Sequence, residues 1–344
     1  MDKDQFELIQ DNHILTLRLK AEYDYSLKIP LNIPTDFEFK DPIAVIIHIF
    51  YTDLIGELLS YIENIPAHTD LYISTDSEEK KIRIERQLKN YNKGAVVIRV
   101  FTNRGRDIAP CFIGFRDIFD QYQYCLHIHT KKSAYNPRLG QWRGYLLDSL
   151  IGSVEIATSN LYLLAQDDIG VIFPQHFADI RGNIEWGNNF QNTKWLLGLA
   201  GIEINQTTLL EFPSSSMLFA KTAALKKMYS LPVLWDDFEK ERGQIDGTLA
   251  HAYERSFLYF CESSGYKWIK VNQNETNKQF VFNSLDPLAM SHKIEQVYPR
   301  VSDNYYEVFA QLQTEWMINN NSLPKKIKRN FSFVKRLIKK LFLN

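Results

Sequence analysis

Two short stretches of this chain combine basic residues, histidines and turn-forming residues, and they are the first place to look for chemistry. One holds two arginines and an aspartate, and the other holds two histidines followed by two lysines. They read Asn103-Arg104-Gly105-Arg106-Asp107-Ile108-Ala109-Pro110 and Tyr124-Cys125-Leu126-His127-Ile128-His129-Thr130-Lys131-Lys132-Ser133. Two such cation-rich loops side by side would bind a polyanion, and a diphosphate is the ligand that we expect.

The elements that carry these stretches are predicted to be strands. Each stretch follows an apolar, β-branched run, at residues 96–101 and 124–128, so each charged cluster should begin where a strand ends. In an open α/β sheet the ligand lies at the carboxyl ends of the strands. A simpler interpretation stays open: Arg104 and Arg106 could pair with Asp107 on the surface, and Lys131 and Lys132 could form a solvated turn.

The rest of the body alternates between the two periodicities. Strands are expected at 44–50, 70–75, 96–101, 124–129 and 169–174, and helices at 54–65, 78–91, 108–119, 141–166 with a break near Gly152, and 246–262. Residues 212–221 begin as a strand and pass into a helix near Leu225, and runs at 13–19 and 25–29 are β-like. Strand–helix–strand spacing of this kind predicts βαβ units, a mostly parallel sheet and flanking helices.

Composition restricts the classes of function. The 344 residues are 45% apolar, enough for one large core or two modest ones, and the net charge of -1 argues against a general nucleic-acid binder. Cys111, Cys125 and Cys261 are too few and too scattered for a disulfide framework or a zinc site, which is typical of a reducing cytosol.

The two ends of the sequence differ in character. The first eight residues are polar and acidic, so we expect no targeting peptide, and no apolar run reaches the length of a membrane span. Residues 325–340 are rich in Lys and Arg, and Val334, Leu337, Ile338 and Leu341 follow helical spacing. This pattern predicts a basic amphipathic helix on an anionic membrane surface, although a terminal helix docked on the body would also fit.

These patterns divide the chain into four parts. We expect a β-like N-terminal segment at 1–40, the main α/β domain at 41–275, a helical extension at 276–323 and the basic amphipathic helix at 324–344.

Several separated motifs together resemble the rhamnan synthesis F family, glycosyltransferase-like proteins of bacterial cell-surface polysaccharide assembly. The resemblance runs from about residue 43 to 266. It rests on the residues 70–75, 103–110, 127–133, Trp142-Arg143, 147–153, Ser216-Met217 and 243–255. The sequence departs from the family pattern at Cys111, where an aromatic residue is usual, and at Ser214-Ser215, where Ala-Gly is usual.

The resemblance implies a glycosyltransferase with a GT-A-type, Rossmann-like fold. The implied reaction moves L-rhamnose from dTDP-L-rhamnose to a lipid-linked glycan, with inversion, on the cytoplasmic face of the plasma membrane. Two alternatives stay open: a transferase that uses another nucleotide deoxysugar, and a non-catalytic carbohydrate-binding or scaffold protein of the assembly complex.

The resemblance also suggests where the donor would lie. Ser74 and Asp76 would hold the nucleoside, and the diphosphate would be bound by Asn103, Arg104, Arg106, Asp107, His127, His129, Lys131 and Lys132. Metal-dependent GT-A enzymes carry Asp-X-Asp where this chain has His127-Ile128-His129, so we expect fixed cations to replace the metal and no cofactor. The paired histidines leave a transition-metal site as an alternative.

The same comparison suggests the catalytic and acceptor groups. Asp246, at the start of a late helix, is the leading candidate for the general base, and a helix N-cap is its alternative role; Glu185 is the reserve base. Trp142, Arg143, Trp186 and His251 are the residues expected near the acceptor sugar. A structural role is open for Trp142, Arg143 and His251, whereas Trp186 lies in a Gly/Asn-rich stretch that is typical of a mobile loop.

Overall fold

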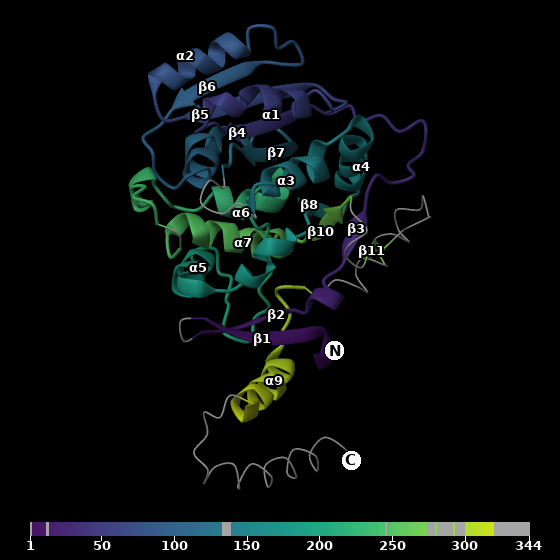
Figure 1. Ribbon diagram of the computed structural model, residues 1–344, viewed down its shortest axis with the longest axis vertical. Helices are drawn as coiled ribbons and strands as arrows, with labels where there is room; N and C mark the ends of the chain where they lie inside the picture. Colours follow the sequence, from purple (N-terminus) through teal and green to yellow (C-terminus); the bar gives the residue numbers. More distant parts are fainter. Residues whose placement is uncertain are drawn as a thin grey trace.

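A nine-stranded sheet runs through the computed structural model, which describes residues 2–11, 14–132, 139–244, 246–273, 279–280, 292 and 300–319 (Figure 1). Within these residues the strand order is β11-β3-β10-β8-β9-β7-β4-β5-β6. The strands are β3 (Ser26–Lys28), β4 (Ile43–His48), β5 (Thr69–Thr75), β6 (Val96–Val100), β7 (Tyr124–His129), β8 (Ile169–Pro174), β9 (Leu218–Lys221), β10 (Lys267–Asn272) and β11 (Gln279–Phe280).

The sheet is parallel except for one strand. β9 lies between β7 and β8 and is antiparallel to both, whereas every other pairing is parallel. The predicted mostly parallel sheet is therefore confirmed. β4 and β7 are buried at all six positions, which is why their sequences read as continuous apolar runs.

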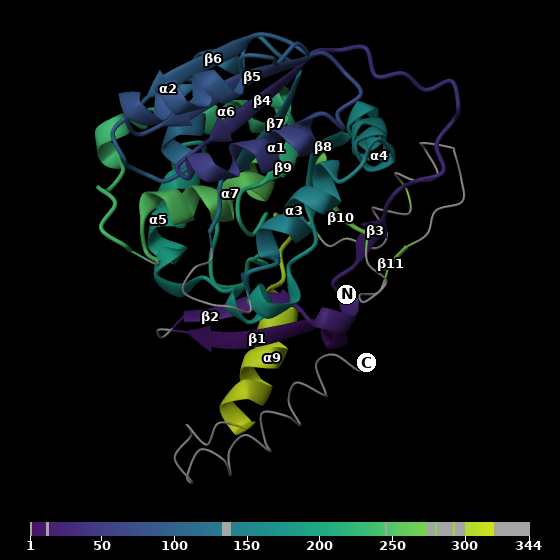
Figure 2. The same ribbon diagram turned by 45° about the horizontal axis from the view of Figure 1, so that its top comes forward.

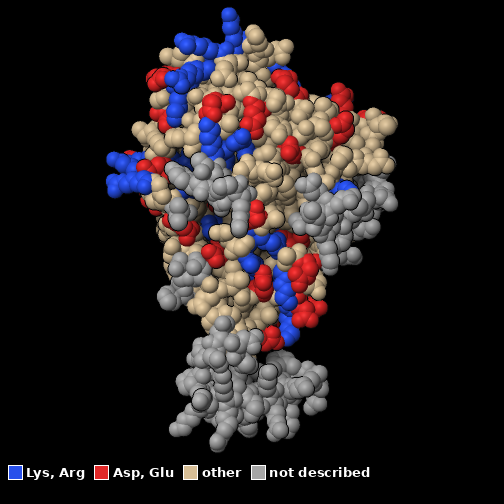
Figure 3. Space-filling view, in the orientation of Figure 1, with Lys and Arg blue, Asp and Glu red and all other residues tan. Residues whose placement is uncertain are grey.

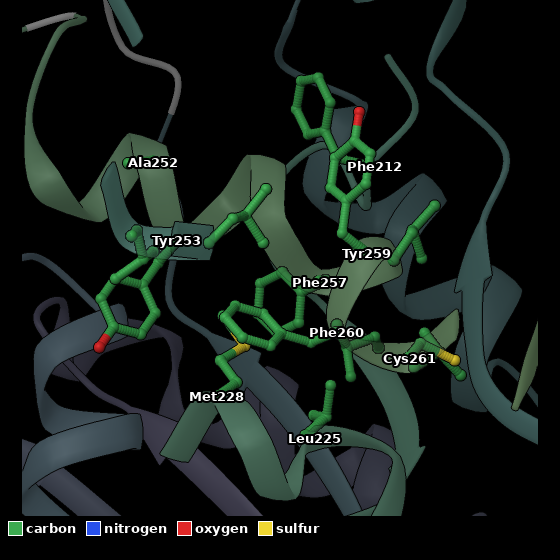
Figure 4. Packing of buried hydrophobic residues seen from close by; sticks show 14 of the residues in the cluster. Phe212, Leu225, Met228, Ala252, Tyr253, Phe257, Tyr259, Phe260 and Cys261 are labelled. Carbon is green, nitrogen blue, oxygen red and sulfur yellow. The ribbon is translucent and has the colours of Figure 1, made fainter. Parts of the chain in front are cut away.

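Helices cover both faces of the sheet. On one face lie α1 (Ile55–Ile62), α2 (Glu78–Gln87), α3 (Trp142–Ile151) and α4 (Val154–Ala165); on the other lie α5 (Phe190–Gly198), α6 (Lys226–Tyr229) and α7 (Leu249–Ser263). Each layer has its own hydrophobic cluster. Figure 4 shows Phe257 and Phe260 of α7 next to Met228 of α6 and the neighbouring Leu225.

Local signals explain where the helices begin and end. The predicted break near Gly152 is confirmed: α3 ends at Ile151, and the Ser153 hydroxyl caps α4 by accepting from the Ile156 N–H at 3.3 Å. The helix expected at 108–119 is instead a π-helical turn (Pro110–Gly114) followed by a 3₁₀ turn (Arg116–Ile118). The N–H of Phe115 reaches the Pro110 carbonyl at 3.0 Å, five residues back, and this wide turn ends the regular helix.

The N-terminal segment divides between two places. β1 (Phe6–Asp11) and β2 (Ile14–Leu19) form an antiparallel hairpin, whereas β3 joins the central sheet beside β10. Figures 1 and 2 both show the hairpin at one end of the molecule next to α9 (Tyr306–Asn319), and the rings of Phe6 and Tyr305 lie 5.2 Å apart. The predicted basic helix at 324–344, and most of the predicted extension at 276–323, lie outside the described residues.

Candidate functional site

The carboxyl ends of β4, β5 and β7 meet at one edge of the sheet. β5 lies on one side of β4 and β7 on the other, so the chain changes direction across the sheet at this point. His48 at the end of β4 is in register with Ser74 and with His129, and its Nδ1 lies 2.9 Å from the Ser74 hydroxyl. Such a reversal in strand order is where open α/β sheets bind ligands.

A cluster of buried polar groups fills this edge. His127 and His129 point to the same face of β7, where they meet Asp107 from the loop after β6. His127 Nε2 lies 3.7 Å from the Asp107 carboxylate, and the Ser216 hydroxyl donates to that carboxylate at 2.5 Å. The two predicted strand-end clusters are thus in contact.

Electrostatics sets the charge of this cluster. Burial alone would raise the pKa of Asp107, but the imidazoles of His129 and His127 and the Ser216 hydroxyl hold it below its ordinary value. Burial lowers the pKa of His48 to about 4 and lowers that of His127 as well. At neutral pH the site therefore holds a buried carboxylate beside the neutral imidazoles of His48 and His127.

The turn that leads into β9 forms one wall of the cluster. Its carbonyls accept hydrogen bonds from both histidines: Ser216 O from His127 Nδ1 at 2.8 Å, and Ser215 O from His129 Nε2 at 2.9 Å. Ser215 has φ +105° and Ser216 φ +58°; with Arg106, at φ +54°, they are the non-glycine residues with positive φ in the described part. Strained backbone of this kind is concentrated at functional sites.

Lys131 turns toward this wall. Its Nζ lies 3.5 Å from the centre of the Trp142 ring, and no carboxylate among the described residues pairs with it. Burial lowers its pKa to about 8, although Glu254 and Asp107 act in the opposite direction. A half-buried ammonium ion that feels two acidic groups but is paired with neither is suited to receive an anion.

Lys132 and three predicted arginines are already engaged by protein groups. Lys132 Nζ pairs with Asp53 at 2.5 Å. Arg143 forms a two-pronged pair with Glu57 and donates to the Lys131 carbonyl, and Arg104 donates to the Phe238 carbonyl at 2.8 Å. Arg106 donates to the Gln244 carbonyl and lies 3.6 Å from Glu241, but it remains exposed. Arg106 is therefore the predicted arginine best placed to reach a ligand.

The predicted nucleoside residues lie at the end of β5. Ser74 is buried against His48, and Asp76 accepts an ion pair from Lys80 at 2.6 Å. Asn103 is exposed, and its carbonyl accepts from the Glu241 N–H at 3.4 Å. Asn103 is thus accessible, Asp76 is half-buried, and Ser74 is buried.

Asp246 is held by several donors. Its Oδ2 accepts from the Asn188 N–H at 2.8 Å, Oδ1 accepts from the Asn189 amide, and Arg255 lies 3.9 Å away. Burial alone would raise its pKa, but these donors keep it below the ordinary value. A Cβ at Gly187 would approach Oδ2 to 2.5 Å, so glycine is required beside this carboxylate. The N-cap of α7 is Thr248, so the alternative of Asp246 as that cap is wrong.

Three other predicted residues have structural contacts. His251 Nδ1 lies 2.8 Å from the Thr248 hydroxyl at the start of α7, where burial lowers the His251 pKa. The Glu185 carbonyl accepts from Arg255 at 3.1 Å. The ring of Trp186 is completely buried beside Tyr259, so it is not exposed to a sugar, and we do not retain it as an acceptor residue.

Two residues of the site were not selected from the sequence. Glu254 accepts from the Ser215 N–H at 2.6 Å. It is also one of the two carboxylates that partly offset the lowering of the Lys131 pKa by burial. Ser215 supplies the carbonyl that receives His129. The signal in the sequence that could have identified Glu254 is its helical spacing of three from His251.

One other group of side chains has the ligand types of a metal site. Asp24, His176 and Glu211 place ligand atoms within 4.8 Å of one another, and all three are buried. The ammonium of Lys270, itself 0% exposed, pairs with Asp24 and lies 2.7 Å from Glu211. The lysine thus occupies the position that a metal cation would take.

Charges of both signs are interspersed on the face of the molecule shown in Figure 3, in keeping with the net charge of -1. All three cysteines are buried, and burial raises the pKa of each. In the part of the chain that the structure describes, no helix has both the length and the apolar character needed to cross a membrane.

Comparisons with known proteins complete the description of the site. The chain is 31% identical over 232 residues to the Uncharacterized protein WxcX of two strains of Xanthomonas campestris pv. campestris, B100 and ATCC 33913. This match covers 67% of the chain and 33% of WxcX, so the chain spans about a third of the length of these relatives.

Among solved structures, a mannosyltransferase from Pyrobaculum calidifontis, in complex with GDP-Man and Mn²⁺, aligns with 83% of this chain and 71% of its own, at 12% identity and a TM-score of 0.38. The family model described as Rhamnan synthesis protein F matches residues 2–266. The chain therefore belongs to the rhamnan synthesis protein F family.

Proposed function

We propose that this chain is a glycosyltransferase of the GT-A type, which moves L-rhamnose from dTDP-L-rhamnose to a lipid-linked glycan in polysaccharide synthesis. The observation that carries the proposal is the Lys131 ammonium, half-buried just after β7 and without a carboxylate partner among the described residues. Membership of the rhamnan synthesis protein F family supports the substrate class.

The proposed donor lies across the carboxyl ends of the parallel strands. Asp76 and Asn103 would contact the nucleoside side, and Lys131 and Arg106 would neutralise the diphosphate. Fixed cations in a partly dehydrated site stabilise the charge that develops on a leaving group more than they would in water. Trp142 and Arg143 would position Lys131 rather than bind a sugar. The Trp142 ring contacts the Lys131 ammonium, and Arg143 donates to the Lys131 carbonyl.

The proposed reaction is a single displacement. An acceptor hydroxyl oxygen forms a bond to the anomeric carbon, the bond from that carbon to the phosphate oxygen breaks, and dTDP leaves with the electron pair. The hydroxyl proton passes to a carboxylate, for which Asp246 is the first candidate and Glu254 the second. Glu185, whose backbone carbonyl accepts from Arg255, stays the reserve candidate.

A carbohydrate-binding or scaffold role is the second candidate function. Asp246 already accepts hydrogen bonds from Asn188 and Asn189, and its lowered pKa makes it a weak base. A protein that binds nucleotide and glycan without transferring the sugar would have the same fold.

The expected cellular position follows from the proposed substrates. A lipid-linked acceptor and the basic pattern at 325–340 suggest that the protein binds the inner face of the plasma membrane. Truncation before Pro324 should then abolish binding to anionic vesicles; equal binding by the shortened chain would contradict the proposal.

Calorimetry with dTDP, dTDP-L-rhamnose, UDP and GDP, each with and without EDTA, tests the proposed donor. We expect dTDP and dTDP-L-rhamnose to bind more tightly than the other nucleotides, with no change on adding EDTA. Loss of binding in EDTA would point to metal dependence, and preference for UDP or GDP would change the donor. Absence of binding by every nucleotide would contradict the transferase.

A further inference from the structure

A shallow groove lies between α5 and the loop before α7. Trp195 on α5 and Leu199, which follows the end of that helix, are 51% and 40% exposed, which is unusual for large apolar side chains. The groove has a volume of about 330 Å³, and Asn192, Pro232, Asp237, Glu239 and Leu249 complete its lining. We call it the Trp195 groove.

The chemistry of the Trp195 groove matches a saccharide better than a phosphate or an apolar peptide. An indole ring offers a flat apolar surface for the C–H face of a sugar. Asp237 and Glu239 each accept one backbone N–H, from Leu234 at 2.8 Å and Leu249 at 3.1 Å, and a carboxylate has further acceptor positions for hydroxyl groups. The two carboxylates would repel an anionic ligand.

The groove shares a wall with the candidate base. The Asn192 amide donates to the carbonyl of Gly247 at 3.0 Å, and Gly247 follows Asp246 directly. The N–H of Leu249, two residues further along, is held by Glu239. The segment 246–249 therefore borders the groove through Leu249 and carries Asp246 at its other end. A chain of sugars bound in the groove would lie next to the segment that holds this carboxylate.

We propose that the Trp195 groove binds the glycan acceptor, with Trp195 as the stacking platform and Asn192, Asp237 and Glu239 as the polar contacts. This inference rests on the proposed glycosyltransferase function and assigns its acceptor subsite. The acceptor is a neutral oligosaccharide, which is consistent with the acidic rim of the groove.

The test measures binding of an α-linked rhamnose trisaccharide by calorimetry in the presence of dTDP. Four proteins are compared: the unaltered chain, Trp195→Ala, Trp195→Phe, and Ile82→Ala as a matched control on α2 with a side chain 47% exposed. We expect Trp195→Ala to weaken trisaccharide binding roughly two- to tenfold, as loss of one aromatic contact would. Trp195→Phe should restore most of the affinity, and Ile82→Ala should have none of this effect.

Each other outcome has a definite meaning. The inference fails if Trp195→Ala binds the trisaccharide as tightly as the unaltered chain, or if the unaltered chain binds dTDP but no trisaccharide. It also fails if Trp195→Ala converts a self-associating protein into a monomer without changing saccharide affinity, because a second copy would then be the occupant. Trisaccharide binding through Trp195 without any nucleotide binding would support the groove and contradict the transferase.

Discussion

His127 donates its Nδ1 proton to the carbonyl oxygen of Ser216 at 2.8 Å. A carbonyl can only accept, so this bond fixes the tautomer and leaves Nε2 facing Asp107 at 3.7 Å. The Ser216 hydroxyl closes the arrangement by donating to the same carboxylate. Through these three residues the end of β7, the loop after β6 and the turn before β9 are held together.

The strained turn gives the first prediction. Ser215 has φ +105° and a buried hydroxyl without a partner among the described residues, so Ser215→Gly should raise the free energy of unfolding by about 1 kcal/mol. Ser216→Gly also relieves a positive φ, of +58°, but it removes the hydroxyl that donates to the buried Asp107, and this loss should outweigh the relief and lower the free energy of unfolding. Urea denaturation of both variants measures the two changes, and a fall in stability for Ser215→Gly would show that its side chain contributes.

Acid sensitivity should arise partly from His48. Burial lowers its folded pKa to about 4 from an ordinary value of 6.5, so the unfolded chain takes up a proton first as the pH falls. The free energy of unfolding is therefore unaffected by His48 above pH 6.5. It falls as the pH drops from 6.5 toward 4, by about 3 kcal/mol in total. Unfolding free energies of His48→Gln, measured from pH 8 to pH 4, should fall less steeply than those of the unaltered chain. Parallel curves would contradict the assignment.

The two neighbouring lysines, Lys131 and Lys132, should contribute very differently to dTDP binding. Lys131 is half-buried beside Trp142, whereas Lys132 is exposed and pairs with Asp53, so Lys131→Ala should weaken dTDP binding at pH 7 about tenfold or more and Lys132→Ala should not. Calorimetry with both variants tests this. An equal effect of the two would mean that the cluster acts only by its net charge.

The same lysine should make binding depend on pH. Lys131 carries its charge below its pKa of about 8 and loses it above, so dTDP affinity should fall as the pH rises from 7 to 9. A bound diphosphate favours the charged form, so the fall in affinity should be gradual. Lys131→Ala should show a flatter pH dependence; the same fall in affinity in that variant would assign the titration to another group.

Much of the sheet could be predicted because buried parallel strands have a strong signature. β7 and β8 occupy the residues expected, 124–129 and 169–174, since each is apolar enough to be covered on both faces. β3 and β9 were harder, because they have only three and four residues and their neighbours in the sheet, β10 and β7, come from distant parts of the chain. Short strands are specified by these long-range pairings rather than by local pattern.

The candidate site could be predicted at the level of loops but not of single side chains. The 103–107 and 127–132 stretches do meet, as the strand ends required. Adjacent residues at the end of a strand point in opposite directions, which separates Lys131 from Lys132. Trp186 lies in a Gly/Asn-rich stretch typical of a loop. Its backbone N–H nevertheless donates to the Thr16 hydroxyl and its ring stacks on Tyr259, and no local pattern indicates these contacts.

The buried ammonium of Lys270 should balance the charges of Asp24 and Glu211, as a metal ion at this place would. Lys270→Ala leaves Asp24 and Glu211 buried without their cation, so we expect a loss of stability on the order of 3–5 kcal/mol. Zn²⁺ should raise the melting temperature of this variant, because His176 completes a set of three ligands, but should not raise that of the unaltered chain. Lys267→Ala, on the same strand, is the control with a partly exposed pair to Asp168. Stabilisation of the unaltered chain by Zn²⁺ would show that the metal competes with the lysine.

The identity of the base can be decided between two carboxylates. If Asp246 accepts the acceptor proton, Asp246→Asn should keep its affinity for dTDP while the rate of sugar transfer falls roughly 10²- to 10⁴-fold. Glu254→Gln is the matched variant, since the amide oxygen can still accept from the Ser215 N–H. Because the donors around Asp246 lower its pKa, the rate of the unaltered chain should stay level as the pH falls from 7 to 5. A larger loss in Glu254→Gln than in Asp246→Asn would transfer the role to Glu254, and Asp246 would then serve to fix the 187–189 turn through Asn188 and Asn189.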